Sequence, residues 1–534
     1  MIDPAKSTSS GKGVARAATT IMLGNVASRL LGVVRDQTIA FFFGLSGVTS
    51  AFVVAQTVPL LLHELIVGGL ISAALVPVLA GYAGDEREFG RAVSAILGLA
   101  TLVLGIAIVA LVALARPVTL LLGAGLPEPA FELAVELLRT ALVSLLFLGL
   151  AGVATGALYA GQIYTYPAFS PAIFNLGIIV AVVTLTAPLG PQSLAVGLVV
   201  GGALQLVIQA IGLRRIAIRP RLDLSHPAVR RVLELYPPVL MGLLIAQLGV
   251  VVDRQLASRT GEEGLAIMRF ATTIVQFPIG LVVTATSFAV LPPLSRAAVA
   301  MTAATGAQEA RAEYRRVLAL GLRLSLFLML PATVGLILLR EPLVRFLFER
   351  GAFDAQATQQ TALAFLVYAP QLPFVAIDQI LIFAYYARQD TRTPNLVGVA
   401  SVACYLLAAL ALLNPYGVYG LVAANTVQNA VHGLIMLGLV WRYLGWPGSP
   451  SGMGSPGSPA FLVALAKILV ATAAMGLGLL ALTPILNPLA TPLRLLAGVA
   501  IGAAIYLTVG IGLRSAELRL VFDLVRESVS RARG

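Results

Sequence analysis

Charged residues and cysteine are both scarce in this sequence of 534 residues. Only 11% of the residues are charged and 58% are hydrophobic, a balance that excludes a soluble globular protein. The single cysteine, Cys404, excludes an intramolecular disulfide and a cysteine-based metal site. The three histidines, at positions 63, 226 and 432, are too far apart to form a zinc motif. We therefore expect no redox chemistry and no metal site.

Catalytic and nucleotide-binding motifs are also missing. The short connections between apolar runs contain no phosphate-binding loop, no GxSxG elbow and no HExxH motif. The net charge of +12 is concentrated in these connections, where membrane orientation explains it better than nucleic acid does. We therefore predict a protein that is not an enzyme and has no nucleic-acid partner.

Long apolar runs dominate the sequence, and each is long enough to cross about 30 Å of hydrocarbon. They predict an all-α polytopic membrane protein with about fourteen transmembrane helices. The predicted limits of these runs are residues 18–43, 48–82, 90–115, 132–157, 168–187, 191–212, 233–258, 265–298, 313–339, 356–387, 395–413, 417–442, 459–484 and 489–514.

An internal repeat divides the chain. Residues 157–167 (ALYAGQIYTYP) and 384–394 (AYYARQDTRTP) are identical at five of eleven positions, 227 residues apart. Because each half then has an even number of helices, the two six-helix halves form a parallel repeat with one membrane orientation. The predicted parts are the first half 1–212, a cytoplasmic connection 213–232, the second half 233–442, a linker 443–458, two added helices 459–514 and an amphipathic tail 515–534.

Ionisable residues occur inside the first apolar run. Arg29 and Arg35 would be costly on a lipid-facing surface, so we expect them to face protein or water. Asp36 can partly neutralise them. Two intramembrane arginines suit a phosphate-bearing group, because the guanidinium fork matches phosphate oxygens. The alternative is an arginine–aspartate pair that holds helices together.

The second apolar run carries polar groups around a proline. Pro59 removes a helix hydrogen bond and is predicted to act as a hinge close to His63. A bent polar helix of this kind indicates a cavity wall, with His63 as a substrate contact. Alternatively, His63 is bonded to a neighbouring carbonyl oxygen.

The seventh run repeats the charged pair of the first run as Asp253 and Arg254. A carboxylate near the end of a membrane helix can bind a cation or proton that couples transport. The alternative is that Asp253 simply pairs with Arg254 or Arg259.

The eighth run begins with a polar stripe. Arg269, Thr272 and Gln276 recur at helical spacing just before Pro278, a second predicted hinge. Arg269 and Gln276 are candidate substrate contacts, and solvent exposure at the start of the helix is the alternative for Arg269.

Several motifs resemble, in the same order, those of the MviN/MurJ lipid II flippases. The strongest is the segment 25–44 (NVASRLLGVVRDQTIAFFFG). The others are 72–79 (SAALVPVL), 251–258 (VVDRQLAS), 276–280 (QFPIG), 346–354 (FLFERGAFD) and 387–394 (ARQDTRTP). The resemblance implies the fold of the multidrug/oligosaccharidyl-lipid/polysaccharide exporters, with a central cavity and a groove for a polyprenyl tail at helices 13 and 14.

The resemblance also implies a function and a location. The substrate would be the undecaprenyl-diphosphate-linked peptidoglycan precursor, lipid II, carried across the bacterial cytoplasmic membrane by alternating access. Arg29 and Arg35 would bind its diphosphate, and Asp253 would contribute to a monovalent-cation site. The membrane potential is the alternative source of energy for transport, and no further cofactor is implied. Membrane lipids and cell-wall synthesis enzymes are the expected partners.

The chain departs from the family pattern at positions where charged residues are usual. Ser50, His63, Gly68 and Thr273 stand at those positions. Two alternative functions therefore stay open. One is export of another polyprenyl-linked saccharide or of an amphiphilic drug, and the other is a membrane scaffold that transports nothing.

The distribution of lysine and arginine predicts that both termini are cytoplasmic and that connections 44–50 and 187–193 face outward. Single cysteines in these connections, in a background without Cys404, should react with an impermeant reagent added from outside. Strong external labelling within 213–232 would contradict this topology.

Overall fold

The computed structural model describes residues 11–219, 221–301, 306–444, 459–520 and 522, and the regular structure within these ranges is entirely helical. The expected linker 443–458 and amphipathic tail 515–534 fall largely outside the described residues. Contacts divide the chain into two compact units. The first comprises Met1–Ala266 with Arg350–Asp354, and the second comprises Ile267–Glu349 with Ala355–Gly534.

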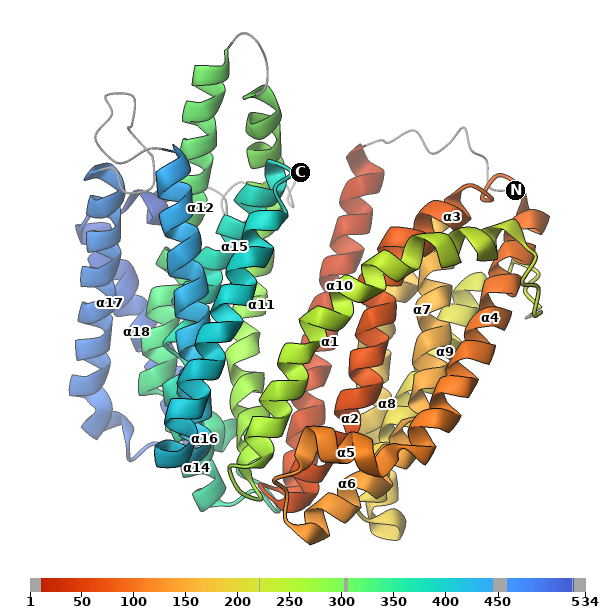
Figure 1. Cartoon of the computed structure of the whole chain (residues 1–534). Coiled ribbons are helices and arrows are strands. Elements are labelled where there is room, and N and C mark those ends of the chain that lie inside the picture. The colour runs from red at the N-terminus through yellow and green to blue at the C-terminus, as the bar shows by residue number, and fades with distance from the viewer. Residues whose placement is uncertain (1–10, 220, 302–305, 445–458, 521, 523–534) are drawn as a thin grey trace. The chain divides into compact units, whose positions relative to one another are not determined.

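The first unit contains the red to yellow-green helices of Figure 1. They are α1 (Gly11–Phe43), α2 (Gly47–Glu64), the π-helix η2 (Leu65–Leu75), α3 (Val76–Ala80), α4 (Glu86–Ala113), α5 (Ala115–Gly123), α6 (Glu128–Ala141), α7 (Ser144–Ala160), α8 (Thr165–Leu189), α9 (Gln192–Leu213) and α10 (Pro227–Ser258).

The second unit contains the green to blue helices (Figure 1). They are α11 (Gly264–Ala300), whose first turn still belongs to the first unit, α12 (Ala307–Leu338), α13 (Arg340–Phe348), α14 (Ala355–Tyr368), α15 (Gln371–Ala387), α16 (Arg392–Leu444), α17 (Pro459–Leu486) and α18 (Thr491–Gly512).

The predicted fold class is confirmed. Eight helices of the described chain are long and apolar enough to cross a membrane, or ten if each of two bent helix pairs is one span. All fourteen predicted runs lie on helices, because α16 contains two of them on either side of a break at Gly417. The long second run is divided among α2, η2 and α3.

The predicted repeat is visible in the local geometry of each unit. The pair α6 and α7 is bent by 42°, and the pair α14 and α15 by 44°. Both pairs end in a turn whose glutamine has a positive φ, 59° at Gln162 and 60° at Gln389. The next amide in each turn donates back to the last helical turn, as in a Schellman motif. These features lie 227 residues apart, which is the offset of the sequence repeat.

Helix α10 packs on the π-helix of the first unit. The Tyr236 hydroxyl donates to the Leu65 carbonyl at 3.1 Å. Gly69 brings the backbone of η2 close to Leu243 and Val239, leaving little room for a larger residue. The start of the second predicted half is therefore attached to the first unit.

The added helices α17 and α18 pack on α12 within the second unit. The ring of Tyr506 lies 5.2 Å from that of Phe327, and its hydroxyl donates to the Phe327 carbonyl at 2.8 Å. Glu517, just beyond α18, pairs with Arg323 of α12 at 3.1 Å. An ion pair with a buried carboxylate thus attaches the start of the C-terminal segment to α12.

The two repeated glycine turns should be sensitive to alanine. Gly190 and Gly417 adopt φ 53° and 56°, both with ψ −132°, a conformation that costs other residues about 1–3 kcal/mol. We expect Gly190→Ala and Gly417→Ala each to lower the free energy of unfolding by that amount. Gly438→Ala, at an exposed helical site with open space, is the control and should not destabilise the protein. Thermal unfolding in detergent measures all three, and equal stability among them would contradict this account.

Candidate functional site

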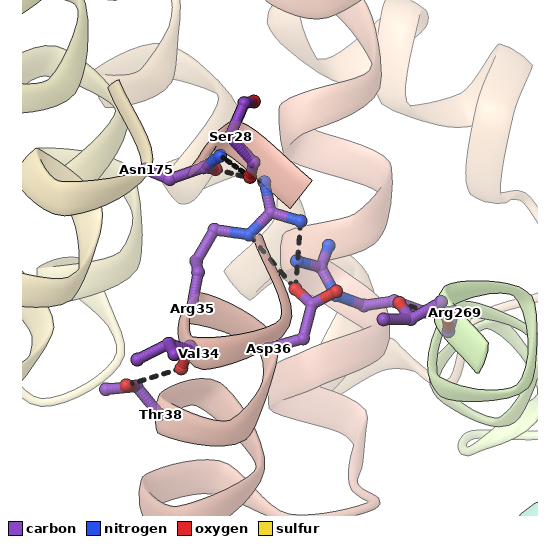
Figure 2. Close-up of polar contacts among 8 residues, drawn as sticks. Ser28, Val34, Arg35, Asp36, Thr38, Asn175 and Arg269 are labelled. Atoms are coloured by element: carbon purple, nitrogen blue, oxygen red, sulfur yellow. Dashed lines mark hydrogen bonds and ion pairs between the residues drawn. The ribbon is translucent and has the colours of Figure 1, made fainter. Parts of the chain in front are cut away.

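A polar cluster joins α1 to α8 in the first unit (Figure 2). The Arg35 guanidinium contacts Asp36 Oδ1 through Nε at 3.0 Å and through Nη2 at 2.9 Å. Its Nη1 donates to Asn175 Oδ1 at 3.0 Å. Asp36 is almost completely buried, with 3% of its side chain exposed, whereas 23% of the Arg35 side chain is exposed. The cluster therefore holds a partly accessible cation against a buried carboxylate.

Asn175 fixes the orientation of this cluster. While its Oδ1 accepts from Arg35, its Nδ2 donates to the Ser28 carbonyl of α1 at 3.1 Å. The two helices approach closely because Gly24 faces the backbone of Ala168, where a Cβ atom would collide. The Asn175 amide thus hydrogen-bonds to both a carbonyl and a guanidinium of α1.

The cluster is compatible with both alternatives for Arg35, a structural pair with Asp36 and a phosphate-binding group. It links α1 to α8, as a structural pair would. A guanidinium has five N–H groups, however, and these contacts engage three of them. A phosphate oxygen can therefore bind to Arg35 without breaking the cluster.

Arg29 lies on the same helix with a half-buried side chain. It precedes Asp36 by seven residues, so the two share one face of α1. The predicted arrangement of charge along α1 is therefore consistent with its helical geometry.

His63 lies at the end of α2 and hydrogen-bonds to the Leu148 carbonyl of α7. Its Nδ1 is buried and has no hydrogen-bond partner among the described residues. Pro59 lies inside α2, which continues to Glu64 and then changes into the π-helix η2. π-helical segments occur frequently at functional sites. The sequence indicated an irregularity in this run but not its type.

Asp253 lies near the end of α10, and its Oδ2 is 3.5 Å from Arg254 Nη1. About a fifth of its side chain, 21%, is exposed. The end of α10 is held by the α5–α6 corner, where the Gly125 amide donates to the Ser258 hydroxyl at 3.0 Å. The structure thus shows the pairing with Arg254, and the cation-binding role stays a prediction.

The other predicted contacts lie on α11 in the second unit. Arg269 is half-buried, and its carbonyl accepts from the Thr273 hydroxyl at 3.1 Å. Gln276 is exposed, and Pro278 lies within a continuous helix. A site that combines these residues with Arg35 stays a prediction.

Two features of the structure are not among the predictions from the sequence. One is Asn175, whose role depends on a helix contact that no local pattern reveals. The other is a hydrogen bond between α15 and α16, in which His432 Nδ1 lies 2.8 Å from Asp378 Oδ1. The signal for this pair was present, because both residues interrupt apolar runs. In the described ranges, no three His, Cys, Asp or Glu side chains group as a metal site.

Comparison with known proteins gives one consistent family. The family model "Lipid II flippase MurJ" matches residues 39–497. The lipid II flippase MurJ of Burkholderia cenocepacia is 31% identical over 466 residues, covering 84% of this chain and 87% of the relative. The probable lipid II flippase MurJ of Rhizobium meliloti is 30% identical over 542 residues, covering 96% and 95%.

Solved structures share the fold. A lipid II flippase MurJ in an inward closed conformation aligns with a TM-score of 0.76 at 23% identity, covering 92% of this chain and 98% of that one. An inward-facing multidrug resistance MATE family transporter of the MOP superfamily aligns with a TM-score of 0.62 at 15% identity, covering 78% and 94%.

Replacing Asn175 with alanine should weaken the α1–α8 contact. The change removes one acceptor from a charged group and leaves the buried polar partners less satisfied, at a cost of about 1–3 kcal/mol. We expect Asn175→Ala to lower the thermal unfolding temperature measured in detergent. Asn487→Ala, at an exposed turn, is the matched control. Equal unfolding temperatures for the two variants would contradict the contribution of Asn175.

Proposed function

The chain belongs to the lipid II flippase MurJ family, and from this premise we propose that it moves lipid II across the bacterial cytoplasmic membrane by alternating access. Relatives of this family are named as flippases, which move a lipid without converting it chemically. The membrane-length helices and the shared fold support the same conclusion. The substrate class is a polyprenyl-linked lipid of peptidoglycan synthesis.

The cluster of Arg35, Asp36 and Asn175 is the main observation that supports binding of the lipid's diphosphate. A lipid-linked precursor presents a diphosphate between its polyprenyl chain and its saccharide. The Arg35 guanidinium is oriented by two partners and partly exposed, so it can form charge-assisted hydrogen bonds to phosphate oxygens. A low dielectric around the helix strengthens those bonds relative to water.

The remaining predicted contacts complete the proposal. Arg29 adds a second positive charge on α1, while His63 contributes from the first unit. Arg269 and Gln276 contribute from the second. Rearrangement of the helices that hold the headgroup would then expose it alternately to the two membrane sides.

Transport also needs a source of energy, a fixed orientation in the membrane and a process that removes the product. Asp253 is the proposed cation site, with membrane potential as the other source of energy. The distribution of positive charge supports a cytoplasmic location for both termini. Enzymes that consume lipid II on the outer side are the proposed partners, because removal of the product favours net movement.

Removing the charge of Arg35 should abolish transport. Arg35→Ala should lose about 1.5–3 kcal/mol of phosphate binding, roughly a tenfold to hundredfold loss of affinity. Arg35→Lys should retain part of the activity, because it keeps the charge but not the planar fork. The tests are rescue of a flippase-depleted bacterium and translocation of lipid II in proteoliposomes. Arg29→Ala should behave in the same way as Arg35→Ala.

The matched control is Arg91→Ala, because Arg91 is an exposed arginine paired with Glu88 at 2.6 Å on α4. This variant should transport as the parent does. All variants are compared at equal membrane abundance, which separates loss of function from loss of folding. Full rescue by Arg35→Ala would refute the phosphate-binding role.

A further inference from the structure

His432 and Asp378 form a hydrogen-bonded pair between α15 and α16 of the second unit, on helices other than those that carry Arg29, Arg35 and Arg269. His432 Nδ1 and Asp378 Oδ1 are 2.8 Å apart, and 14% and 18% of the two side chains are exposed. Asp378 is nine residues from the end of α15 at Ala387. Asp378 therefore lies between two and three helical turns before the end of α15, inside the apolar part of the helix. An ionisable pair in such a position marks an ion or proton pathway more often than a surface pair does.

The histidine ring contacts three helical segments. One ring nitrogen bonds to Asp378 of α15, and the ring also donates to the Pro394 carbonyl at the start of α16. His432 itself lies beyond the break at Gly417, in the second part of α16. One imidazole thus joins α15 to both parts of α16.

This geometry distinguishes the two protonation states of the ring. A neutral imidazole donates from one ring nitrogen only, whereas imidazolium donates from both. Asp378 and Pro394 both present oxygen acceptors, so only the protonated ring satisfies the two contacts together. Loss of the proton therefore removes one hydrogen bond and also leaves the Asp378 carboxylate without its cationic partner.

The helices of the second unit carry other ionisable side chains, among them Arg296 on α11, Tyr314 on α12, Tyr368 on α14, Tyr385 on α15 and Tyr405 on α16. Phenol and guanidinium groups keep their protons at physiological pH, and a histidine is the side chain that changes charge there. Asp390, in the turn before α16, accepts from the Thr393 backbone and side chain and from the Arg392 amide, which hold the pKa of its carboxyl below its usual range.

We propose that Asp378 and His432 form a proton-binding site that couples a transmembrane pH gradient to lipid movement. One proton is taken up on the imidazole from the aqueous phase on one side and is released to the other side. Its uptake tightens the contact of α15 with both parts of α16, and its release loosens that contact. The coupling rests on the proposed flippase function, whereas proton binding by the pair does not.

The first experiment uses the full chain in proteoliposomes containing lipid II. Translocation is measured with and without an imposed pH gradient, with the membrane potential clamped at zero and sodium equal on both sides. The parent should translocate faster under one gradient direction than without a gradient. Asp378→Asn and His432→Gln should lose this response and keep the rate without a gradient, because each retains a polar group able to hydrogen-bond across the interface.

A nearby pair provides the structural control. Asn429 donates to Gln371 Oε1 at 2.7 Å across the same two helices, and neither side chain titrates. Asn429→Leu should lower the unfolding temperature but preserve the response to the gradient. A parent-like response in Asp378→Asn and His432→Gln would overturn the coupling proposal, and so would loss of the response in Asn429→Leu together with those variants.

A second measurement tests proton binding without transport. The stabilisation from an imidazolium–carboxylate pair is present at low pH and is lost as the pH rises and the imidazole releases its proton. The unfolding temperature of the parent should therefore exceed that of His432→Gln more at about pH 5.5 than at about pH 8. A difference independent of pH would refute the proton site. If the parent moves no lipid II yet shows this dependence, the flippase function fails and proton binding stands.

Discussion

A charged side chain inside a membrane helix needs a partner, because a bare charge in hydrocarbon is costly. In the first unit, the carboxylate of Asp36 and the amide of Asn175 satisfy the Arg35 guanidinium. In the second unit, His432 satisfies Asp378. The bonds of Asn175 to Arg35 and of His432 to Asp378 each join two helices. The contact of Asp36 with Arg35 orients the guanidinium that bonds to Asn175. The groups most costly to bury therefore also determine which helices lie together.

The repeat shows how local chemistry preserves geometry when the sequence has diverged. Gln162 and Gln389 occupy the same left-handed position, and Gly190 and Gly417 share a conformation that is strained for other residues. Turn positions tolerate few residue types, whereas apolar helix positions accept many of similar size. The identities that remain between the halves accordingly include the turn that follows the bent helix pair.

The sequence predicted the helices and their repeat because membrane thickness dictates the length of an apolar run and turn residues mark its ends. It also predicted Arg35 beside Asp36, since the two are adjacent in the chain. It did not predict Asn175 or the bond between His432 and Asp378, because these depend on contacts between residues far apart in sequence. The π-helix after His63 could not be predicted from the pattern of apolar residues either. It differs from an α-helix in its hydrogen bonds but not in its composition.

A transporter must release what it binds, and the pairing of Arg35 with Asp36 suits this requirement. An isolated arginine in a low dielectric would bind a diphosphate tightly and release it slowly. Asp36 is 2.9 Å from the same guanidinium and remains buried beside it, so the local charge is already neutralised in part. Phosphate then gains hydrogen bonds from the N–H groups that are still available but less attraction from net charge. Recognition is kept through the shape of the fork while the binding remains reversible, which is the balance that alternating access demands.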